Sequence, residues 1–486
     1  MATFDADGLT LERIREFVWE IPRQGEMGVP ARVLASEALL EQIAEDKTLE
    51  QLRNATQLPG ITNYAVCMPD GHQGYGFPVG GVGAMDAEEG CLSPGAVGYD
   101  INCGVRMVTT NLTYADVRGR EEELVDALFE AIPSGLGGGG VVETDVGTVE
   151  EILARGVDWA LEHGYAVASD LRHCEDEGMR AGADPSMVTQ RAKERGATQI
   201  GSLGSGNHFL EVQRVTDVFD ETVGAAYGLS ADQIVILIHT GSRGLGHQTC
   251  TDYLRKIERE HGSLLARLPD KELAAAPAGS RLADEYYGAM NAAINFAWVN
   301  RQLLTHRTRE VFADVFGRSW ETLEMDLLYD VAHNIAKRET HTVDGEQRDL
   351  YVHRKGATRA FPAGHPEVPR AYREVGQPVI IPGSMGAGSY VLCGGAASMD
   401  LTFGSTAHGA GRLMSRTQAK RDYWGEDVRD DLREGQAIYV KAQSGATVAE
   451  EAPGVYKDVD EVVRVSDALG IGHRVARTFP VCNIKG

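Results

Sequence analysis

Short glycine-rich segments that carry polar residues lie along almost the whole chain of 486 residues, and their spread strongly limits the possible folds. The first begins at residue 68 and the last ends at residue 486. If their polar side chains form one site, the fold must bring the early part of the chain and its end together. The sequence therefore favours one interwoven domain over residues 1–486, although length alone would suggest about three domains.

One segment, STAHGAGRLMS at residues 405–415, places His408 directly before a glycine-rich turn. Glycines allow the backbone to approach a phosphate closely, and Arg412 and Arg416 supply positive charge. The run 413–420 predicts a helix whose first N–H groups could bind an anion. An imidazole is a competent nucleophile toward phosphorus. Taken alone, such a turn is more often only a helix entry, so this interpretation depends on the other segments.

A second set of residues has the chemistry of metal ligands. It contains one carboxylate, one thiolate and three imidazoles, each beside glycine or at a loop edge: Asp100, Cys103, His208, His239 and His333. Five such groups suffice for two metal ions if the thiolate bridges them. The donor set suits zinc, iron, cobalt or manganese, so it does not identify the metal. Eight other histidines are expected to be ordinary surface or core residues: His163, His173, His247, His261, His306, His341, His365 and His473.

Strand and helix patterns give these residues expected positions. The aliphatic run 233–238 predicts a buried strand that ends at His239, and 378–381 predicts another that ends at a Pro-Gly-Ser loop. His333 falls in a segment, 330–338, with a helical pattern. If 207–211 is a strand, its alternation separates His208 from Asn207 and Glu211 unless the strand bends. Regular βα alternation is absent, so the expected class is mixed α+β, with the site at strand ends and glycine-rich loops.

Other parts of the chain are less informative. Residues 9–60 read as amphipathic helices, and 264–283 as a surface excursion. The glycine run 134–140 could hold a phosphate or be an ordinary loop, so we assign Gly137 to Gly140 no role.

Composition excludes several classes of protein. The formal net charge is −24, so any RNA path must be a local positive patch. The seven cysteines have no CxxC spacing, which argues against a disulfide framework or a zinc ribbon. No apolar run reaches the roughly 20 residues that a bilayer requires, and the N-terminus does not resemble a signal peptide. We therefore expect a cytoplasmic protein with no membrane contact.

Taken together, the segments resemble those of the RtcB-type RNA ligases, which are GTP- and manganese-dependent. The resemblance covers nearly the whole chain and rests, besides 405–415, on MPDGHQGYG at 68–76, GYDINCGVR at 98–106, GSLGSGNHFLE at 201–211, HTGSR at 239–243, DVAHN at 330–334, HRKGATR at 353–359, PGSMGAGSY at 382–390 and IKG at 484–486.

This resemblance implies an activity and its partners. RtcB-type enzymes join RNA 3′-phosphate or 2′,3′-cyclic phosphate ends to 5′-hydroxyl ends in tRNA splicing and RNA repair. It implies that His408 becomes guanylylated, that GTP and two Mn²⁺ ions are required, and that RNA is the partner, together with an archease-type activator in some members. A monomer is expected. Two rival interpretations remain, namely a dinuclear-metal phosphoesterase and a non-catalytic protein that binds RNA ends.

The resemblance also implies residue roles. It places Cys103 as a bridge between two Mn²⁺ ions, one completed by Asp100 and His208, the other by His239 and His333. Nucleotide contacts are expected from Asn207, His208, Phe209, Leu210, Glu211, His333, Asn334, Pro382, Gly383, Ser384, Met385, Ser389, His408, Gly409, Ala410, Gly411 and Lys485. A lysine one residue from the end, as Lys485 is, is ordinarily solvated, but the apolar run before it could dock the C-terminal tail. RNA contacts are expected from Asp70, Lys355, Arg412 and Arg416.

Overall fold

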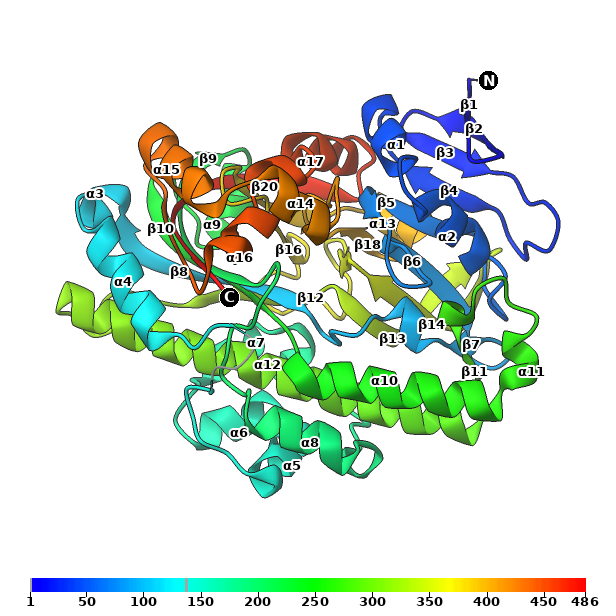
Figure 1. Ribbon diagram of the computed structural model, residues 1–486, viewed down its shortest axis with the longest axis horizontal. Coiled ribbons are helices and arrows are strands. Elements are labelled where there is room, and N and C mark those ends of the chain that lie inside the picture. The colour runs from blue at the N-terminus through cyan, green and yellow to red at the C-terminus, as the bar shows by residue number, and fades with distance from the viewer. Residues whose placement is uncertain (1, 136–138) are drawn as a thin grey trace.

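The computed structural model describes residues 2–135 and 139–486, and within them the expected mixed α+β class is confirmed. Two large twisted sheets lie side by side, with long helices packed beneath them (Figure 1). Of the glycine run 134–140, residues 136–138 lie outside the described part. No helix among the described residues is long and apolar enough to cross a membrane.

The first sheet has the strand order β1-β2-β3-β4-β5-β6-β14-β13. Its strands are β1 Thr3–Ala6, β2 Leu9–Arg15, β3 Val18–Ile21, β4 Ala31–Leu34, β5 Ala65–His72, β6 Val79–Asp86, β13 Asn334–Val343 and β14 Glu346–Lys355. The expectation of helices throughout 9–60 is therefore wrong before residue 36. The N-terminal segment forms antiparallel strands, and Leu9 and Leu11 alternate inward from β2 as a half-buried strand requires.

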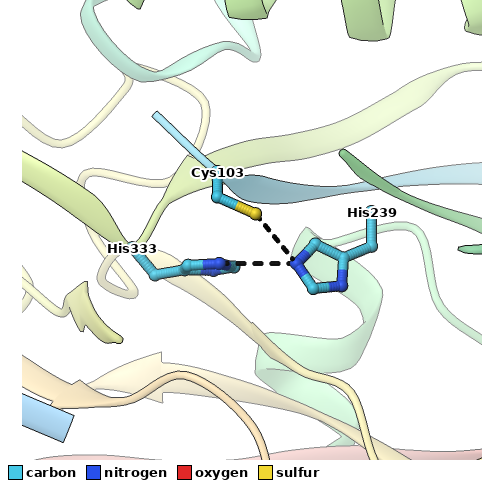
Figure 2. A group of neighbouring side chains, drawn as sticks. All are labelled: Cys103, His239 and His333. Carbon is cyan, nitrogen blue, oxygen red and sulfur yellow. Dashed lines mark hydrogen bonds between the residues drawn. The ribbon is translucent and has the colours of Figure 1, made fainter. Parts of the chain in front are cut away.

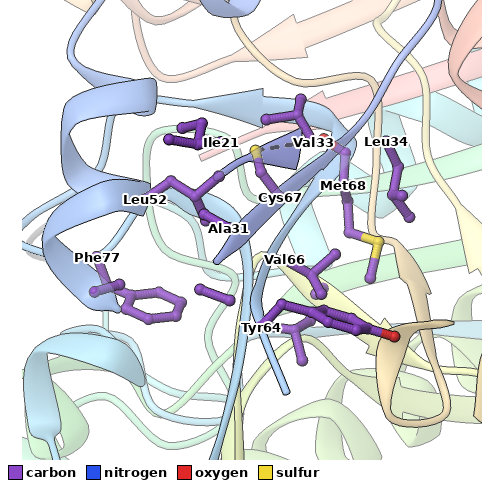
Figure 3. Close-up of a cluster of buried hydrophobic side chains, with 14 of the residues drawn as sticks. Ile21, Ala31, Val33, Leu34, Leu52, Tyr64, Val66, Cys67, Met68 and Phe77 are labelled. Atoms are coloured by element: carbon purple, nitrogen blue, oxygen red, sulfur yellow. Dashed lines mark hydrogen bonds between the residues drawn. The ribbon is translucent and has the colours of Figure 1, made fainter. Parts of the chain in front are cut away.

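Helices follow where the sequence supplies a cap. The side chain of Ser36 accepts the N–H of Leu39 and begins the first helix. Two helices then pack with β4 and β5 around a core that includes Val33, Val66 and Leu52 (Figure 3). This core fixes β5, the strand that carries Asp70.

The second sheet has the order β12-β8-β10-β9-β20-β17-β16, and β19 pairs with β20 in parallel. Its strands are β8 Gly104–Thr113, β9 Phe209–Val218, β10 Gln233–Thr240, β12 Leu327–Ala332, β16 Pro378–Ile381, β17 Ser389–Gly394, β19 Tyr439–Ala442 and β20 Gly472–Lys485. Two further pairs are β7 Cys91–Leu92 with β11 Ala276–Pro277 and β15 Ala357–Arg359 with β18 Ser405–Ala407. The strands expected at 233–238 and 378–381 are confirmed as β10 and β16.

One edge of this second sheet gathers the strand ends that the sequence marked. Because neighbouring strands are antiparallel, β12, β10 and β20 end where β8 and β9 begin. Gly104 of β8 pairs with Thr240 of β10 and Ala332 of β12, and Phe209 of β9 pairs with Lys485 of β20. Segments far apart in sequence therefore meet at a single edge.

The longest helix, α12, runs from Arg281 to Phe316 beneath the second sheet, beside α10 (Figure 1). Ser280 caps its start, and Gly317 ends it in the left-handed conformation with φ of 63°. The helices are α1 Glu37–Ile43, α2 Thr48–Ala55, α3 Tyr114–Val117, α4 Glu121–Ala131, α5 Val146–Arg155, α6 Val157–Glu162, α7 Ala168–Arg172, α8 Gln190–Ala197, α9 Glu221–Ala226, α10 Arg243–Glu260, α11 Gly262–Leu265, α12 Arg281–Phe316, α13 Ala397–Thr402, α14 Arg416–Asp422, α15 Gly425–Gln436, α16 Gly445–Glu450 and α17 Val459–Ala468. Short 3₁₀ turns occur at Pro94–Ala96, Glu175–Gly178, Pro185–Met187, Lys271–Leu273 and Pro453–Val455.

The segment 264–283 has an inner face as well as a surface. Leu273 and Ala275 are fully buried, and β11 pairs with β7. Glu272 accepts the N–H of Gly76, so the segment supports the glycine-rich stretch that follows β5.

Two local expectations near the site are wrong, and a third, which depended on whether 207–211 is a strand, is now decided. His333 lies between β12 and β13 rather than in a helix, because the segment 330–338 continues from one sheet into the other. Residues 207–208 precede β9 in a turn, so strand alternation does not separate Asn207 from His208. The helix expected at 413–420 begins at Arg416, where Ser415 accepts the N–H of Gln418, so the glycine turn does not open directly into a helix.

Candidate active site

The five metal-type residues lie together at the edge of the second sheet. Cys103 immediately precedes β8, His208 precedes β9, and His333 follows β12. His239 is the penultimate residue of β10, whose aliphatic residues are all buried between β8 and β9. The sheet register therefore places four of the donors, and the tight turn before β8 adds Asp100, whose carbonyl oxygen accepts the N–H of Cys103.

Their donor atoms form two groups that share the thiol. In the first, Cys103 Sγ lies 3.3 Å from Nε2 of His239, which lies 3.4 Å from Nε2 of His333 (Figure 2). In the second, Cys103 Sγ lies 3.4 Å from Nε2 of His208, and that nitrogen is 2.9 Å from a carboxylate oxygen of Asp100. Five donors that converge at such distances, four of them from buried side chains, suit metal cations that share the sulfur.

The surroundings favour neutral imidazoles, which have a lone pair for a metal. Burial lowers the pKa of His239 and His333 well below the ordinary value, and nearby positive groups add to the effect. His208 Nδ1 donates to the carbonyl of Leu203 at 2.9 Å, so its Nε2 is left as the ligand atom. Burial alone would raise the pKa of Asp100, but contact with His208 lowers it to about 2.

His408 reaches the same place from β18 and contacts a buried carboxylate. Its Nδ1 lies 2.6 Å from Oδ2 of Asp70, a residue with no solvent exposure. The same oxygen accepts the backbone N–H groups of His408 and Gly409 at 3.0 and 3.1 Å. Although burial by itself raises the pKa of Asp70, its interactions with His408 outweigh this and keep the pKa below its usual value. The imidazole is thus oriented with Nε2 as its reactive atom.

Local backbone geometry makes this contact possible. The pairing of β5 with β6 is irregular between Cys67 and His72, and Asp70 lies in that bulge. Gly411 has φ of 78°, and a Cβ there would meet the carbonyl oxygen of Asp70 at 2.2 Å. Lys457, which is buried, donates to the carbonyl of Gly71. The glycine-rich turn after His408 therefore permits the close approach of two chain segments.

A cavity of about 280 Å³ is lined both by metal-type residues and by His408. The ring of His408 lies 4.8 Å from that of His333, centroid to centroid. Of the residues expected at the site, those that line the cavity are Asp100, Cys103, Asn207, Phe209, His239, His333, Asn334, Lys355, Pro382, Gly383, Ser384, His408, Gly409, Ala410, Gly411, Arg412, Arg416 and Lys485. Those that do not line it are Asp70, His208, Leu210, Glu211, Met385 and Ser389.

The residues outside the lining differ in what they do. Leu210 and Met385 pack in hydrophobic clusters, so their side chains face away from the cavity. Ser389 accepts the N–H of Gly383 and a hydrogen bond from Gln213, and so fixes the loop after β16. These three residues support the site rather than face it.

Glu211 lies on the same face of β9 as Phe209, which lines the cavity. Gln213 donates to one oxygen of Glu211 at 2.5 Å, and Asn483 donates to the other. Burial raises the pKa of Glu211 to about 7, with Lys485 acting in the opposite direction. Lys485 is itself buried, 4.9 Å above the ring of Phe209, so the C-terminal tail is docked as the preceding apolar run predicts.

The expected RNA-contact residues are less exposed than their charges suggest. Lys355 is buried and donates to the carbonyls of Tyr75 and Gly95 at 2.6 and 3.0 Å, and burial lowers its pKa to about 7. Arg412 is paired with the buried Glu451. Arg416, about half exposed, contacts the same carboxylate at 3.4 Å.

Sequence reasoning missed several residues at the cavity. Among them are Tyr99 and Tyr456, which line the cavity. Asp70 was expected at the site, but as an RNA contact rather than as the support of the His408 imidazole. Tyr99 stands beside Asp100 in a recognised segment, which was the available signal. Nothing in the local sequence marks Tyr456.

Comparisons with known proteins agree with this geometry. A family model described as tRNA-splicing ligase RtcB matches residues 51–486. The chain belongs to the RtcB family. Curated relatives named tRNA-splicing ligase RtcB include those of Thermococcus kodakarensis at 56% identity and Aeropyrum pernix at 52%. Each alignment covers 98% of this chain, with 99% and 100% of the relative. A third, from Methanococcus maripaludis, is 49% identical over 98% of this chain and 99% of its own length. All these RtcB relatives match essentially end to end.

Proposed function

We propose that this RtcB-family protein is an RNA ligase of tRNA splicing and RNA repair, which joins RNA 3′-phosphate or 2′,3′-cyclic phosphate ends to 5′-hydroxyl ends through a guanylylated histidine. The observation that carries the proposal is the pairing of His408 with Asp70 beside the five convergent donors. A phosphoesterase would need the donors but not a buried carboxylate that orients a sixth, nucleophilic residue.

In the first step, Nε2 of His408 attacks the α-phosphate of GTP. The N–P bond forms as the bond between the α-phosphorus and the bridging oxygen breaks, and pyrophosphate leaves. Contact with Asp70 keeps the proton on Nδ1, so the lone pair is on Nε2, and the carboxylate stabilises the positive charge that develops on the ring.

The convergent donors fit two divalent cations, which we propose to be Mn²⁺. Cys103 would bridge them, with Asp100 and His208 on one and His239 and His333 on the other. Such ions supply positive charge that stabilises developing negative charge on phosphate oxygens. The protein's own contribution is to hold these donors together at the sheet edge.

For the nucleotide, we propose that Glu211 and Lys485 recognise guanine. Ionised Glu211 accepts hydrogen bonds, as the N1–H and N2–H₂ groups of guanine require, and Lys485 donates, as O6 requires. Lys485, the loop 382–384 and the turn after His408 line the cavity, and Glu211 lies outside this lining but near enough to Lys485 for the ammonium group to lower its pKa.

In the later steps, GMP passes from His408 to the RNA 3′-phosphate, and the attacking phosphate oxygen displaces the imidazole. The 5′-hydroxyl of the second RNA then attacks the phosphorus of the RNA 3′-phosphate, forms the phosphodiester and releases GMP. A 2′,3′-cyclic end is first opened by water to the 3′-phosphate. An archease-type activator is a further partner that membership of the family suggests.

Incubation with GTP labelled at the α-phosphate and with Mn²⁺, followed by denaturing electrophoresis, tests the proposal. The expected band is labile to acid, stable to alkali and absent from His408→Ala. That variant should still join RNA that already carries a 3′ guanylyl cap. Cleavage of cyclic phosphate ends without any labelled protein would instead favour the phosphoesterase.

A further inference from the structure

Three aromatic rings contact one another in series beside the cavity, and the last two of them are stacked. Tyr75 contacts Tyr99 edge to face with centroids 5.1 Å apart, and Tyr99 stacks on His247 at 4.8 Å with only 24° between the planes. Tyr99 lines the cavity next to Asp100, whereas His247 is solvent-exposed on α10. The stack therefore leads from the candidate metal centre to the surface.

The stack is held in place rather than loosely packed. Buried Lys355 donates to the carbonyl of Tyr75, and Gly76 donates to Glu272. His247 belongs to the first turns of α10, and Thr251 one turn later donates to its carbonyl. Burial, followed by the charge of Arg195, lowers the pKa of His247, which favours the uncharged ring.

Two arginines lie near these rings, Arg195 near His247 and Arg243 near Asp100, the chain neighbour of Tyr99. Arg195 is partly exposed, and its charge helps to lower the pKa of His247. Its guanidinium donates a hydrogen bond to the side-chain oxygen of Gln248 at 3.1 Å. Arg243 begins α10 with φ of 52°, and its Nε donates to Ser202 at 3.3 Å. Among the described residues, neither guanidinium forms an ion pair within 4.0 Å, and the acidic group that acts on Arg243 is Asp100. Two such cations beside an exposed ring are the combination that binds single-stranded nucleic acid, because arginine pairs with phosphate and a ring stacks on a base.

We propose that Tyr99 and His247 form a stacking platform for an unpaired base at one of the two RNA ends, with Arg195 and Arg243 on the adjoining phosphates. This inference rests on the proposed ligase function. It assigns to His247 a binding role that its sequence context does not indicate. Stacking is tolerant of base identity, as an enzyme that joins diverse RNA ends requires.

The test measures RNA affinity by fluorescence anisotropy, which does not need ligase activity. The probes are short single strands with either a 3′-phosphate or a 5′-hydroxyl end, each with a normal or an abasic terminal nucleotide. The proteins are wild type, His247→Ala, His247→Phe and the control His261→Ala, which changes a histidine just beyond the far end of the same helix.

We expect His247→Ala to weaken binding of one probe about tenfold, since stacking on one base is worth roughly 1–3 kcal/mol and 1.4 kcal/mol is tenfold. His247→Phe should stay within about threefold of wild type. An abasic terminal nucleotide should weaken RNA binding by the wild-type protein but not by His247→Ala. This effect should occur with only one of the two probes, and that probe identifies the RNA end that stacks on the platform. His261→Ala should match wild type.

An equal loss of RNA affinity in His247→Ala and His247→Phe would contradict the stacking platform. The same holds if the abasic nucleotide weakens RNA binding equally in wild type and His247→Ala. Guanylylation of His408 is measured in parallel and should be unchanged in all variants. A failure of guanylylation in wild type would contradict the proposed function, whereas a base-independent affinity contradicts only the platform.

Discussion

At the scale of single residues, the contact between Asp70 and His408 makes the sharpest prediction. In Asp70→Asn, the amide can still accept the N–H groups of His408 and Gly409, but it carries no charge and can donate to Nδ1, which moves the imidazole proton to Nε2. We expect guanylylation to slow by about 10²- to 10⁴-fold. Single-turnover labelling with GTP measures this, with unchanged Mn²⁺ content as the control. A rate within threefold of wild type would show that Asp70 does not orient the nucleophile.

Glu211 predicts a pH dependence of GTP binding. Its pKa is raised to about 7 by burial, with Lys485 from β20 opposing, and guanine requires the ionised form. Affinity should therefore be highest above pH 7 and fall about tenfold per pH unit below it, because protonation is then linked to release of the nucleotide. Calorimetry with His408→Ala avoids turnover.

The matched control for this pH dependence is Glu211→Gln, which should bind GTP more weakly with a flat profile between pH 6 and 8. Because the phosphates of GTP also titrate in this range, the difference between the two profiles is the measured quantity. Parallel profiles would place the titrating group elsewhere.

At the scale of elements, the donors placed by β8, β10 and β12 at one sheet edge predict how metal binding responds to substitution. Cys103 belongs to both groups of donors, whereas His333 belongs to one. We expect His333→Ala to retain one tightly held Mn²⁺ per chain and Cys103→Ser to retain fewer, since the serine hydroxyl is a poor bridging ligand. Metal analysis after gel filtration decides this. Two tightly held ions in Cys103→Ser would mean that the sulfur is ordinary packing.

The same elements show what the sequence could predict. The strand before His239 was predictable because its five consecutive aliphatic residues are mostly β-branched and too few for a helix. His333 was misassigned because the residues on either side of it, at the end of β12 and the start of β13, are mostly buried and show no strand alternation. The contact of Asp70 with His408 joins residues 338 positions apart, and no local pattern contains that information.

At the scale of the whole molecule, the net charge of −24 predicts weak general attraction for RNA and a small number of phosphate contacts. The partly or fully exposed cations that we propose as phosphate contacts are Arg195, Arg243 and Arg416, of which Arg416 lines the cavity. Three contacts to a single strand correspond to a slope of roughly −2 in log K against log salt, at about −0.7 per phosphate. Neutralising one of them should bring the slope closer to zero by about 0.7.

Arg195→Ala and Arg318→Ala separate this local patch from the surface at large. Arg318 is exposed just past the end of α12 and contributes the same charge change at a different place. We expect only Arg195→Ala to alter the slope, because the Debye length of about 10 Å at 0.1 M salt screens a remote charge from the RNA. Anisotropy titrations from 50 to 300 mM salt measure both variants. Equal changes in slope would mean that RNA senses the overall charge of the protein, and the localised path would have to be abandoned.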